Sequence, residues 1–331
     1  MGLLNLFKSK NKQNTLFKRF SANAFFHLPE QLSPLAGGIE VIEQFPRLNW
    51  PNISEALQKD SSYSTIPNLF DQLSKFWLAR LANALTSEYR IVESEHFILL
   101  SPQPDKQVNL FLKFLEGAHK RIQHSLKGIV DNERPAKLVV LEFDSIDSYY
   151  AYIAYHYPVE GEFAASGGVF IRQGLGHFAI PHYELSVTES VAAHELTHAL
   201  LSHLELPVWV DEGLAVNVER MITRHSPFQM NQQKHQKHLQ FWNEETIQTF
   251  WSGESFSIPG DSNELSYQLA QLIVQSLAED HEGLIRFVNS ASFSDGGEGA
   301  AQKVYGGSLA AIIDQFFGPG EWRPLPDSWT N

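Results

Sequence analysis

The 331-residue sequence contains no cysteine. Disulfide bonds and thiolate ligands are therefore excluded, and any metal site must use nitrogen and oxygen donors. No apolar run approaches the roughly 18 residues that indicate a membrane-spanning helix. Met1–Phe20 lacks the apolar run and cleavage site of a secretory signal peptide, and Leu6 stands where a myristoylation signal needs Ser or Thr. These absences together predict a cytoplasmic protein.

Basic side chains are scarce over most of the chain. Lys and Arg number 25 against 38 Asp and Glu, and five of the basic residues lie in residues 1–20. Without those five, 20 basic side chains face 38 acidic ones, a formal charge of −18. Such a body lacks the basic footprint that nucleic-acid binding requires. For residues 1–20 we expect a flexible, solubilising tail, with contact to an anionic membrane surface as the alternative.

The pentapeptide His194–His198 has the pattern H-E-x-x-H. On a helix, residues four apart share one face, so His194 and His198 can each direct a nitrogen at one Zn²⁺. Glu195 can then act as a general base toward water at the metal. A catalytic zinc needs a third protein ligand, and Glu212, 14 residues after His198, is the best candidate.

The surroundings of the motif argue for a buried site. The neighbouring residues are mostly apolar, so the helix is expected to be buried, and buried histidine and glutamate side chains need partners. Ser186 or Thr188 is expected to cap this helix. The alternative is a pair of surface histidines beside an acid, which would carry no metal.

Together, His194–His198 and the P-x-W-x-x-E-G-L-A segment at Pro207–Ala215 resemble the gluzincin metallopeptidases, in particular the peptidase MA-like domains. The resemblance implies that Glu212 is the third ligand of one zinc ion per chain. It does not extend to the metzincins, which would need Gly and His where Leu201 and Leu204 stand. Thermolysin has an Asp four residues after its glutamate ligand to orient a zinc histidine, whereas this chain has Val216 there. That orienting role falls to Asp211, Asn217 or Glu219, and the sequence does not choose among them.

The pattern and the resemblance predict an α+β fold. A small mixed β-sheet packs on the zinc-binding helix, followed by a helical C-terminal part and preceded by a helical N-terminal extension. We expect strands at 94–100 and 136–143 and a hairpin at 167–172 and 177–181, and helices at 106–126, 145–155, 265–277, 284–290 and 310–317. The predicted division is a basic segment 1–20, an extension 21–90, a metallopeptidase domain 91–320 and a tail 321–331. The extension could also be a prosegment or a partner-binding arm.

Further residues have predicted roles near the metal. Tyr267 is assigned as donor to the oxyanion of the tetrahedral intermediate, and a core tyrosine is the alternative. If Tyr267 does not act as this donor, His177, His182 and His225 are the next residues to consider for the role. Gly167 and Gly168 would let a substrate backbone approach closely and add as a strand to the sheet edge, or they simply form a bulge or turn before the hairpin. His235 and His238 lie in a polar stretch that is more typical of a solvated helix face than of an accessory metal site.

The sequence thus predicts a zinc-dependent hydrolase, with a metallopeptidase acting on a peptide or protein substrate as the first interpretation. Two alternatives stay open. One is a non-catalytic zinc module that binds a partner, and the other is a zinc hydrolase of a non-peptide amide or ester. Glu195 argues against the module, because a purely structural site has no use for a general base.

Overall fold

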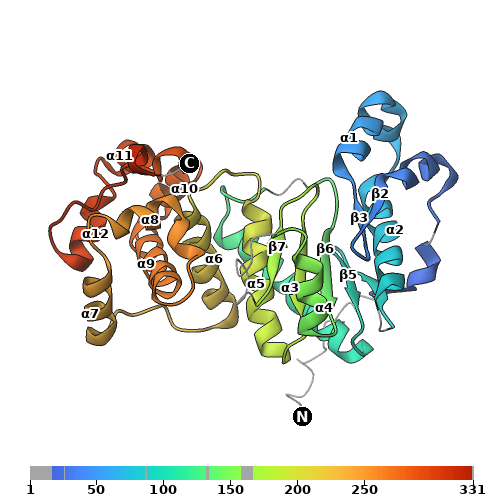
Figure 1. Cartoon of the computed structure of the whole chain (residues 1–331), viewed down its shortest axis with the longest axis horizontal. Coiled ribbons are helices and arrows are strands. Elements are labelled where there is room, and N and C mark those ends of the chain that lie inside the picture. The colour runs from blue at the N-terminus through green and yellow to red at the C-terminus, as the bar shows by residue number, and fades with distance from the viewer. Residues whose placement is uncertain (1–16, 26, 86–87, 132–133, 158–166, 330–331) are drawn as a thin grey trace, which may run out of the picture.

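A six-stranded mixed sheet forms the centre of the molecule (Figure 1). The computed structural model describes residues 17–25, 27–85, 88–131, 134–157 and 167–329. The strand order is β1-β4-β5-β6-β8-β7, with these bounds: β1 Lys18–Ser21, β4 Arg90–Glu93, β5 Phe97–Ser101, β6 Leu138–Phe143, β7 Val169–Ile171 and β8 His177–Pro181. The α+β fold class predicted from the sequence is confirmed at this level.

The middle of the sheet is parallel and both edges are antiparallel. β5, β6 and β8 run in parallel, while β1 and β4 at one end and β7 at the other pair antiparallel with their neighbours. The central strands are buried on both faces, which explains why β5 and β6 read as nearly continuous apolar runs. β7 is the last strand in the order, so no strand of the described residues pairs with its outer backbone edge.

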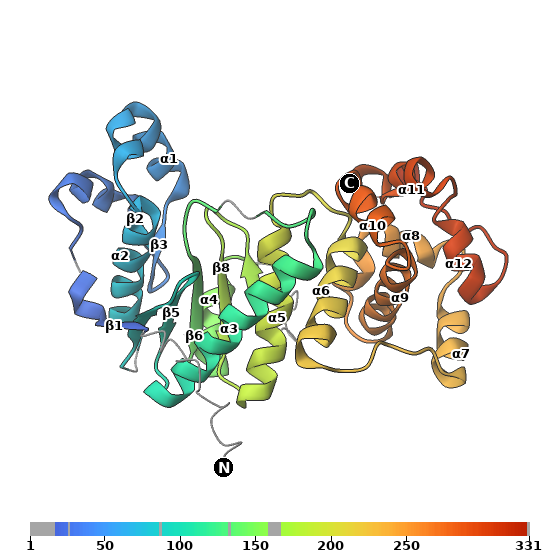
Figure 2. The ribbon, with the colours of Figure 1, turned by 180° about the vertical axis from the view of Figure 1, so that it is seen from behind.

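Each face of the sheet carries its own apolar core. On one face lie the helices α3 (Asp105–Ser125) and α5 (Leu185–Leu201), in a core that continues into the C-terminal helices. On the other face lie the helices α2 (Leu69–Ala84) and α4 (Ile146–Ile153) with the hairpin of β2 (Ile39–Ile42) and β3 (Phe45–Leu48). The sheet is therefore the middle of three layers, as Figure 2 shows from behind.

The N-terminal region supplies much of the second layer. The predicted helical extension contains α1 (Trp50–Lys59) and α2, but also the β2–β3 hairpin, which the sequence did not predict. α2 is tied to the sheet because Lys75 Nζ lies 2.7 Å from a Glu93 carboxylate oxygen in β4. Removing this region would therefore expose the apolar face of the sheet to water.

The expectation of a flexible tail over residues 1–20 is wrong for residues 18–20. Lys18–Ser21 forms β1 and pairs antiparallel with β4, because backbone hydrogen bonding at the sheet edge fixes this short basic segment. Residues 1–16, which make up most of the predicted tail, lie outside the described residues. The alternative of a contact with a membrane surface stays a prediction.

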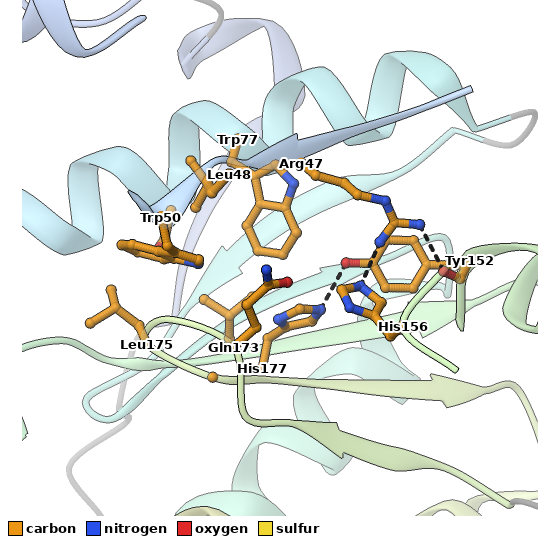
Figure 3. A pocket seen from close by; sticks show the side chains of 12 residues that line it. Arg47, Leu48, Trp50, Trp77, Tyr152, His156, Gln173, Leu175 and His177 are labelled. Atoms are coloured by element: carbon orange, nitrogen blue, oxygen red, sulfur yellow. Dashed lines mark hydrogen bonds between the residues drawn. The ribbon is translucent and has the colours of Figure 1, made fainter. Parts of the chain in front are cut away.

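A buried polar cluster joins β3 to α4 and β8 (Figure 3). Arg47 of β3 donates to the Tyr152 backbone oxygen at 2.9 Å and to His156 Nε2 at 2.5 Å. The Tyr152 hydroxyl lies 2.7 Å from Nε2 of His177 in β8. Burial, and next the nearby Arg47 charge, lower the pKa of His156 to about 4. His156 must therefore stay neutral to accept from Arg47.

This cluster predicts a pH-dependent stability. In the unfolded chain this histidine has a pKa near 6.5, so between pH 6.5 and 4 it binds a proton that it does not bind in the folded protein. The contribution of His156 to the free energy of unfolding is therefore fully present above about pH 6.5 and decreases as pH falls toward 4. We expect the free energy of unfolding, measured with urea, to fall between pH 7 and pH 5 by about 1 kcal/mol less in His156→Gln than in the wild type. The difference is this small because His156 is partly exposed. The exposed His203→Gln is the control, and equal losses in all three proteins would contradict the assignment.

The C-terminal half is mostly helical, as predicted. Its helices are α6 (Val208–Thr223), α7 (Gln232–Phe241), α8 (Thr246–Ser252), α9 (Asp261–Leu277), α10 (His281–Val288), α11 (Glu298–Tyr305) and α12 (Ala310–Phe317). α6 and α9 pack closely at Gly213, where a Cβ atom would lie 2.7 Å from the Ala270 backbone oxygen. No helix within the described part of the chain is long and apolar enough to cross a membrane.

Candidate metal centre

Two packed helices bring the motif residues together. α5 carries His194, Glu195 and His198, and α6 carries Asp211, Glu212 and Glu219. α5 is apolar on most sides and ten of its residues are buried, which fixes its position between the sheet and α6. Its histidines, one turn apart, present their rings on the face toward α6.

The prediction that Ser186 or Thr188 caps this helix is wrong. α5 begins at Leu185, with Glu184 at the N-cap position and no side-chain capping hydrogen bond. The Thr188 hydroxyl donates instead to the Tyr183 backbone oxygen at 3.4 Å. The helix is held in place by burial of its apolar side chains and not by a polar cap.

Three donor atoms converge on one point. Nε2 of His194 lies 3.1 Å from Nε2 of His198, and Oε2 of Glu212 lies 3.2 Å and 3.5 Å from these two nitrogens. Ligands at about 2.0–2.1 Å from a tetrahedral zinc are separated by roughly 3.3 Å, so the three separations match one face of such a tetrahedron. A buried His-His-Glu triad of this kind could hold a metal ion.

The opposite ring nitrogen of each histidine faces a carboxylate. Nδ1 of His198 lies 3.1 Å from Oδ1 of Asp211, and Nδ1 of His194 lies 3.3 Å from Oε2 of Glu219. A carboxylate at Nδ1 keeps the proton on that nitrogen and leaves the Nε2 lone pair free for a metal. The Glu219 carboxylate is itself held by the Ser190 hydroxyl at 2.5 Å.

Asn217, the third candidate for orienting the histidines, does not contact them. Its amide donates to the backbone oxygens of Gly213 and Gln271, at 2.8 Å and 3.0 Å, and so joins α6 to α9. Of the three candidates, Asp211 and Glu219 are the two that lie beside the histidine rings. Glu219 reaches His194 from two helical turns beyond Glu212.

The carboxylates favour positive charge at this point. Burial disfavours a charged His194, but the contacts with Glu212 and Glu219 outweigh it and raise the His194 pKa to about 9. Burial likewise opposes a charged Glu212, but the two histidines hold its pKa well below the usual range. The same field that stabilises imidazolium in the metal-free protein would stabilise a bound cation.

Glu195 is placed differently from the three converging residues. Its carboxylate is buried and accepts a hydrogen bond from the Phe170 backbone N–H in β7. Burial raises the Glu195 pKa above its ordinary value, the direction expected for a carboxylate that takes up a proton. Glu195 lines the same cleft as His194, His198 and Glu212.

The cleft has a volume of about 920 Å³ and runs between β7, α5 and α6 on one side and the segment before α9 on the other. Tyr267 of α9 lines it, with its ring centroid 6.5 Å from that of His194. Burial, and next the charges of Glu212 and Glu195, raise the Tyr267 pKa well above 10, so the phenol keeps its proton. A hydroxyl that keeps its proton beside these residues can donate into the cleft.

The other histidines considered as donors lie elsewhere. His177 belongs to the polar cluster with Tyr152, His182 lies 3.1 Å from Glu142, and His225 lies 2.9 Å from the Thr223 hydroxyl. None of the three is among the described residues that line the cleft. Of the four candidates considered, Tyr267 is the one that lines the cleft.

Gly167 and Gly168 line the cleft beside β7. A Cβ atom on Gly168 would lie 2.5 Å from Cγ1 of Val191 in α5, and one on Gly167 would lie 3.2 Å from Cγ2 of the same residue. Packing of this segment against α5 is thus sufficient to explain glycine at 168. The same contact brings the start of β7 close to α5.

Two further groups that contain histidines are weaker candidates for a metal site. Glu95, His96 and Glu116 could also surround a cation, but Glu116 already binds the His96 backbone N–H at 2.9 Å and its ring at 2.7 Å. His238 lies 3.2 Å from the Gln268 side chain, and His235 lies 2.7 Å from the Phe316 backbone oxygen. His235 and His238 therefore bind protein groups within the C-terminal helices.

One cleft residue was missed by sequence reasoning. Arg172 follows β7 directly, and its Nη2 lies 2.5 Å from Oδ2 of Asp211. The two residues are 39 positions apart, so neither helical spacing nor the motif could connect them.

A scan against protein-family models and a search of curated proteins both gave no match. The resemblance to gluzincins therefore depends on the motif residues and on their arrangement around the triad.

Proposed function

We propose that this protein is a zinc-dependent hydrolase and, within that class, a metallopeptidase of the gluzincin type. The observation that carries the proposal is the convergence of His194, His198 and Glu212, with separations that suit tetrahedral zinc, at the floor of an open cleft that also contains Glu195. A site closed by four protein ligands would suit a structural metal, whereas three ligands leave room for water or substrate.

His194, His198 and Glu212 would hold the ion, and it would supply a Lewis acid and a water of lowered pKa. Glu195, buried and not part of the triad, accepts a proton from the attacking water and then delivers it to the leaving amine. The Tyr267 hydroxyl donates a hydrogen bond to the oxygen on which negative charge develops. Asp211 and Glu219 keep the two imidazoles in the orientation and tautomer that binding needs.

The shape of the cleft supports an extended peptide as the substrate. Among the described strands, β7 has a partner on one side only, and two of its residues, Val169 and Phe170, line the cleft. A peptide can add to such an edge through backbone hydrogen bonds, with the scissile carbonyl brought beside α5. None of the residues described between 17 and 90 lines the cleft, so this part of the N-terminal extension leaves the cleft open to a substrate.

This function predicts chelator-sensitive peptide hydrolysis. Incubation with a mixed peptide library should give cleavage products, because the cleft binds extended chains and Glu195 is in place. A strong zinc chelator should abolish the products, and added Zn²⁺ should restore them. Hydrolysis confined to ester or non-peptide amide substrates would move the assignment to the wider hydrolase class. Zinc binding without hydrolysis of any substrate would favour an interaction module.

A further inference from the structure

Arg172 is the one permanently cationic side chain among the described residues that line the cleft. It is the only lysine or arginine among the described residues that line it, while Glu195, Asp211, Glu212 and Glu219 are all carboxylates. Its side chain is 46% exposed, whereas the Asp211 side chain is 14% exposed. The guanidinium therefore stands at the wall of the cleft and reaches inward to a nearly buried partner.

Each carboxylate oxygen of Asp211 contacts a different side chain. Oδ2 lies 2.5 Å from Arg172 Nη2, and Oδ1 lies 3.1 Å from His198 Nδ1. Neither His198 Nδ1 nor Asp211 Oδ1 has a partner with hydrogen-bond geometry among the described residues, and the ion-pair contact between these two atoms is what brings them together. The orientation of the His198 ring therefore depends on Asp211, and one side of the Asp211 carboxylate depends on Arg172.

The energetic reason for Arg172 is the charge of its partner. A carboxylate that is largely removed from water beside three other carboxylates is costly unless a cation compensates it. An arginine can pair with carboxylate oxygen in a fixed plane and keeps its charge at any working pH. Without Arg172, the Asp211 carboxylate would be free to rotate away from His198, and the His198 ring would lose the contact at its Nδ1.

We propose that Arg172 is a positioning residue for the metal site: it fixes Asp211, and through Asp211 the His198 ring, so that the zinc geometry is set in part from the end of β7. The inference rests on the proposed zinc function and extends it. It links the strand that borders the substrate path to a ligand on α5, through contacts that join three separate elements.

The test compares Arg172→Gln, Arg172→Lys and the control Arg286→Gln, each in the full chain. Arg286 is a suitable control because it too lies near an aspartate, at 3.8 Å from Asp280, its side chain is 56% exposed, and it is not among the described residues that line the cleft. Zinc affinity is measured by competition with a chromophoric chelator, and the geometry of the site by the visible spectrum of the Co²⁺-substituted protein. Thermal unfolding checks that each variant is folded.

We expect Arg172→Gln to weaken zinc binding by about 10–100-fold, the usual effect of losing an outer partner of a metal ligand, and to change the Co²⁺ spectrum. Arg172→Lys should recover part of the affinity, since it keeps the charge but not the planar contact. Arg286→Gln should match the wild type. A double variant with Asp211→Asn should lose little more than Asp211→Asn alone, because both changes break the same path.

The inference is overturned if Arg172→Gln keeps the zinc affinity and the Co²⁺ spectrum of the wild type. A raised KM with unchanged kcat and unchanged metal binding would assign Arg172 to the substrate instead. Additive losses in the double variant would also overturn it. Failure of the proposed function is a separate result, because it is measured on the wild-type protein, which would then bind no zinc or would bind zinc without hydrolysing any substrate.

Discussion

The Glu195→Gln variant is expected to bind zinc as the wild type does and to lose hydrolytic activity by about 10²–10⁴-fold. Glutamine has nearly the same shape as glutamate and still fits beside the Phe170 backbone N–H, but it cannot take up a proton. Since Glu195 is not one of the three converging donors, metal content should stay at the wild-type level. Activity is measured as kcat/KM on a peptide identified by library cleavage.

Glu189→Gln is the matched control for this variant. Glu189 lies on the same helix, and burial raises the pKa of its carboxyl too, but it is not among the described residues lining the cleft. The control should keep full activity. Unchanged hydrolysis in Glu195→Gln would remove the general base from the mechanism, and equal loss in both variants would point to a general disturbance of α5.

The Tyr267→Phe variant is expected to lower kcat by about 10²–10³-fold, with KM and zinc content close to the wild-type values. The hydroxyl is removed while the ring that packs on Phe256 is kept. A donor to the developing oxyanion acts in the transition state, so its loss affects kcat more than substrate binding.

Tyr305→Phe gives a control in the same C-terminal half, because the buried Tyr305 hydroxyl has no hydrogen-bond partner among the described residues. Its activity should be unchanged. If Tyr267→Phe instead lowers thermal stability while turnover per folded molecule stays constant, Tyr267 is a core tyrosine and the oxyanion lacks the donor assigned here.

The parts of the site that the sequence could predict are those determined by short spacing. His194 and His198 are one helical turn apart, and Asp211 and Glu219 lie within two turns of Glu212 on the same helix. For such residues helical geometry limits which side chains can meet. The choice of Asp211 and Glu219 over Asn217 needed the structure, because it depends on how α6 lies against α5 and α9.

Contacts between distant segments could not be predicted in this way. β1 was missed because a four-residue strand in a basic segment gains its stability from pairing with β4, some 70 residues later. The β2–β3 hairpin was missed because its turn places Glu43 at φ 52°, where Gly or Asn would have been the usual signal. Arg172 was missed for the same reason as β1, since only the fold brings it to Asp211.

The most direct test of the central claim is the metal content of the purified protein. We expect about one zinc ion per chain in the wild type by elemental analysis. We expect His194→Ala to lose that zinc and to have a lower thermal unfolding temperature, because metal binding adds to the stability of the folded state. One zinc per chain in the wild type and none in His194→Ala is the result that the account predicts. A folded wild-type protein that binds no transition metal, even after incubation with Zn²⁺, would contradict it.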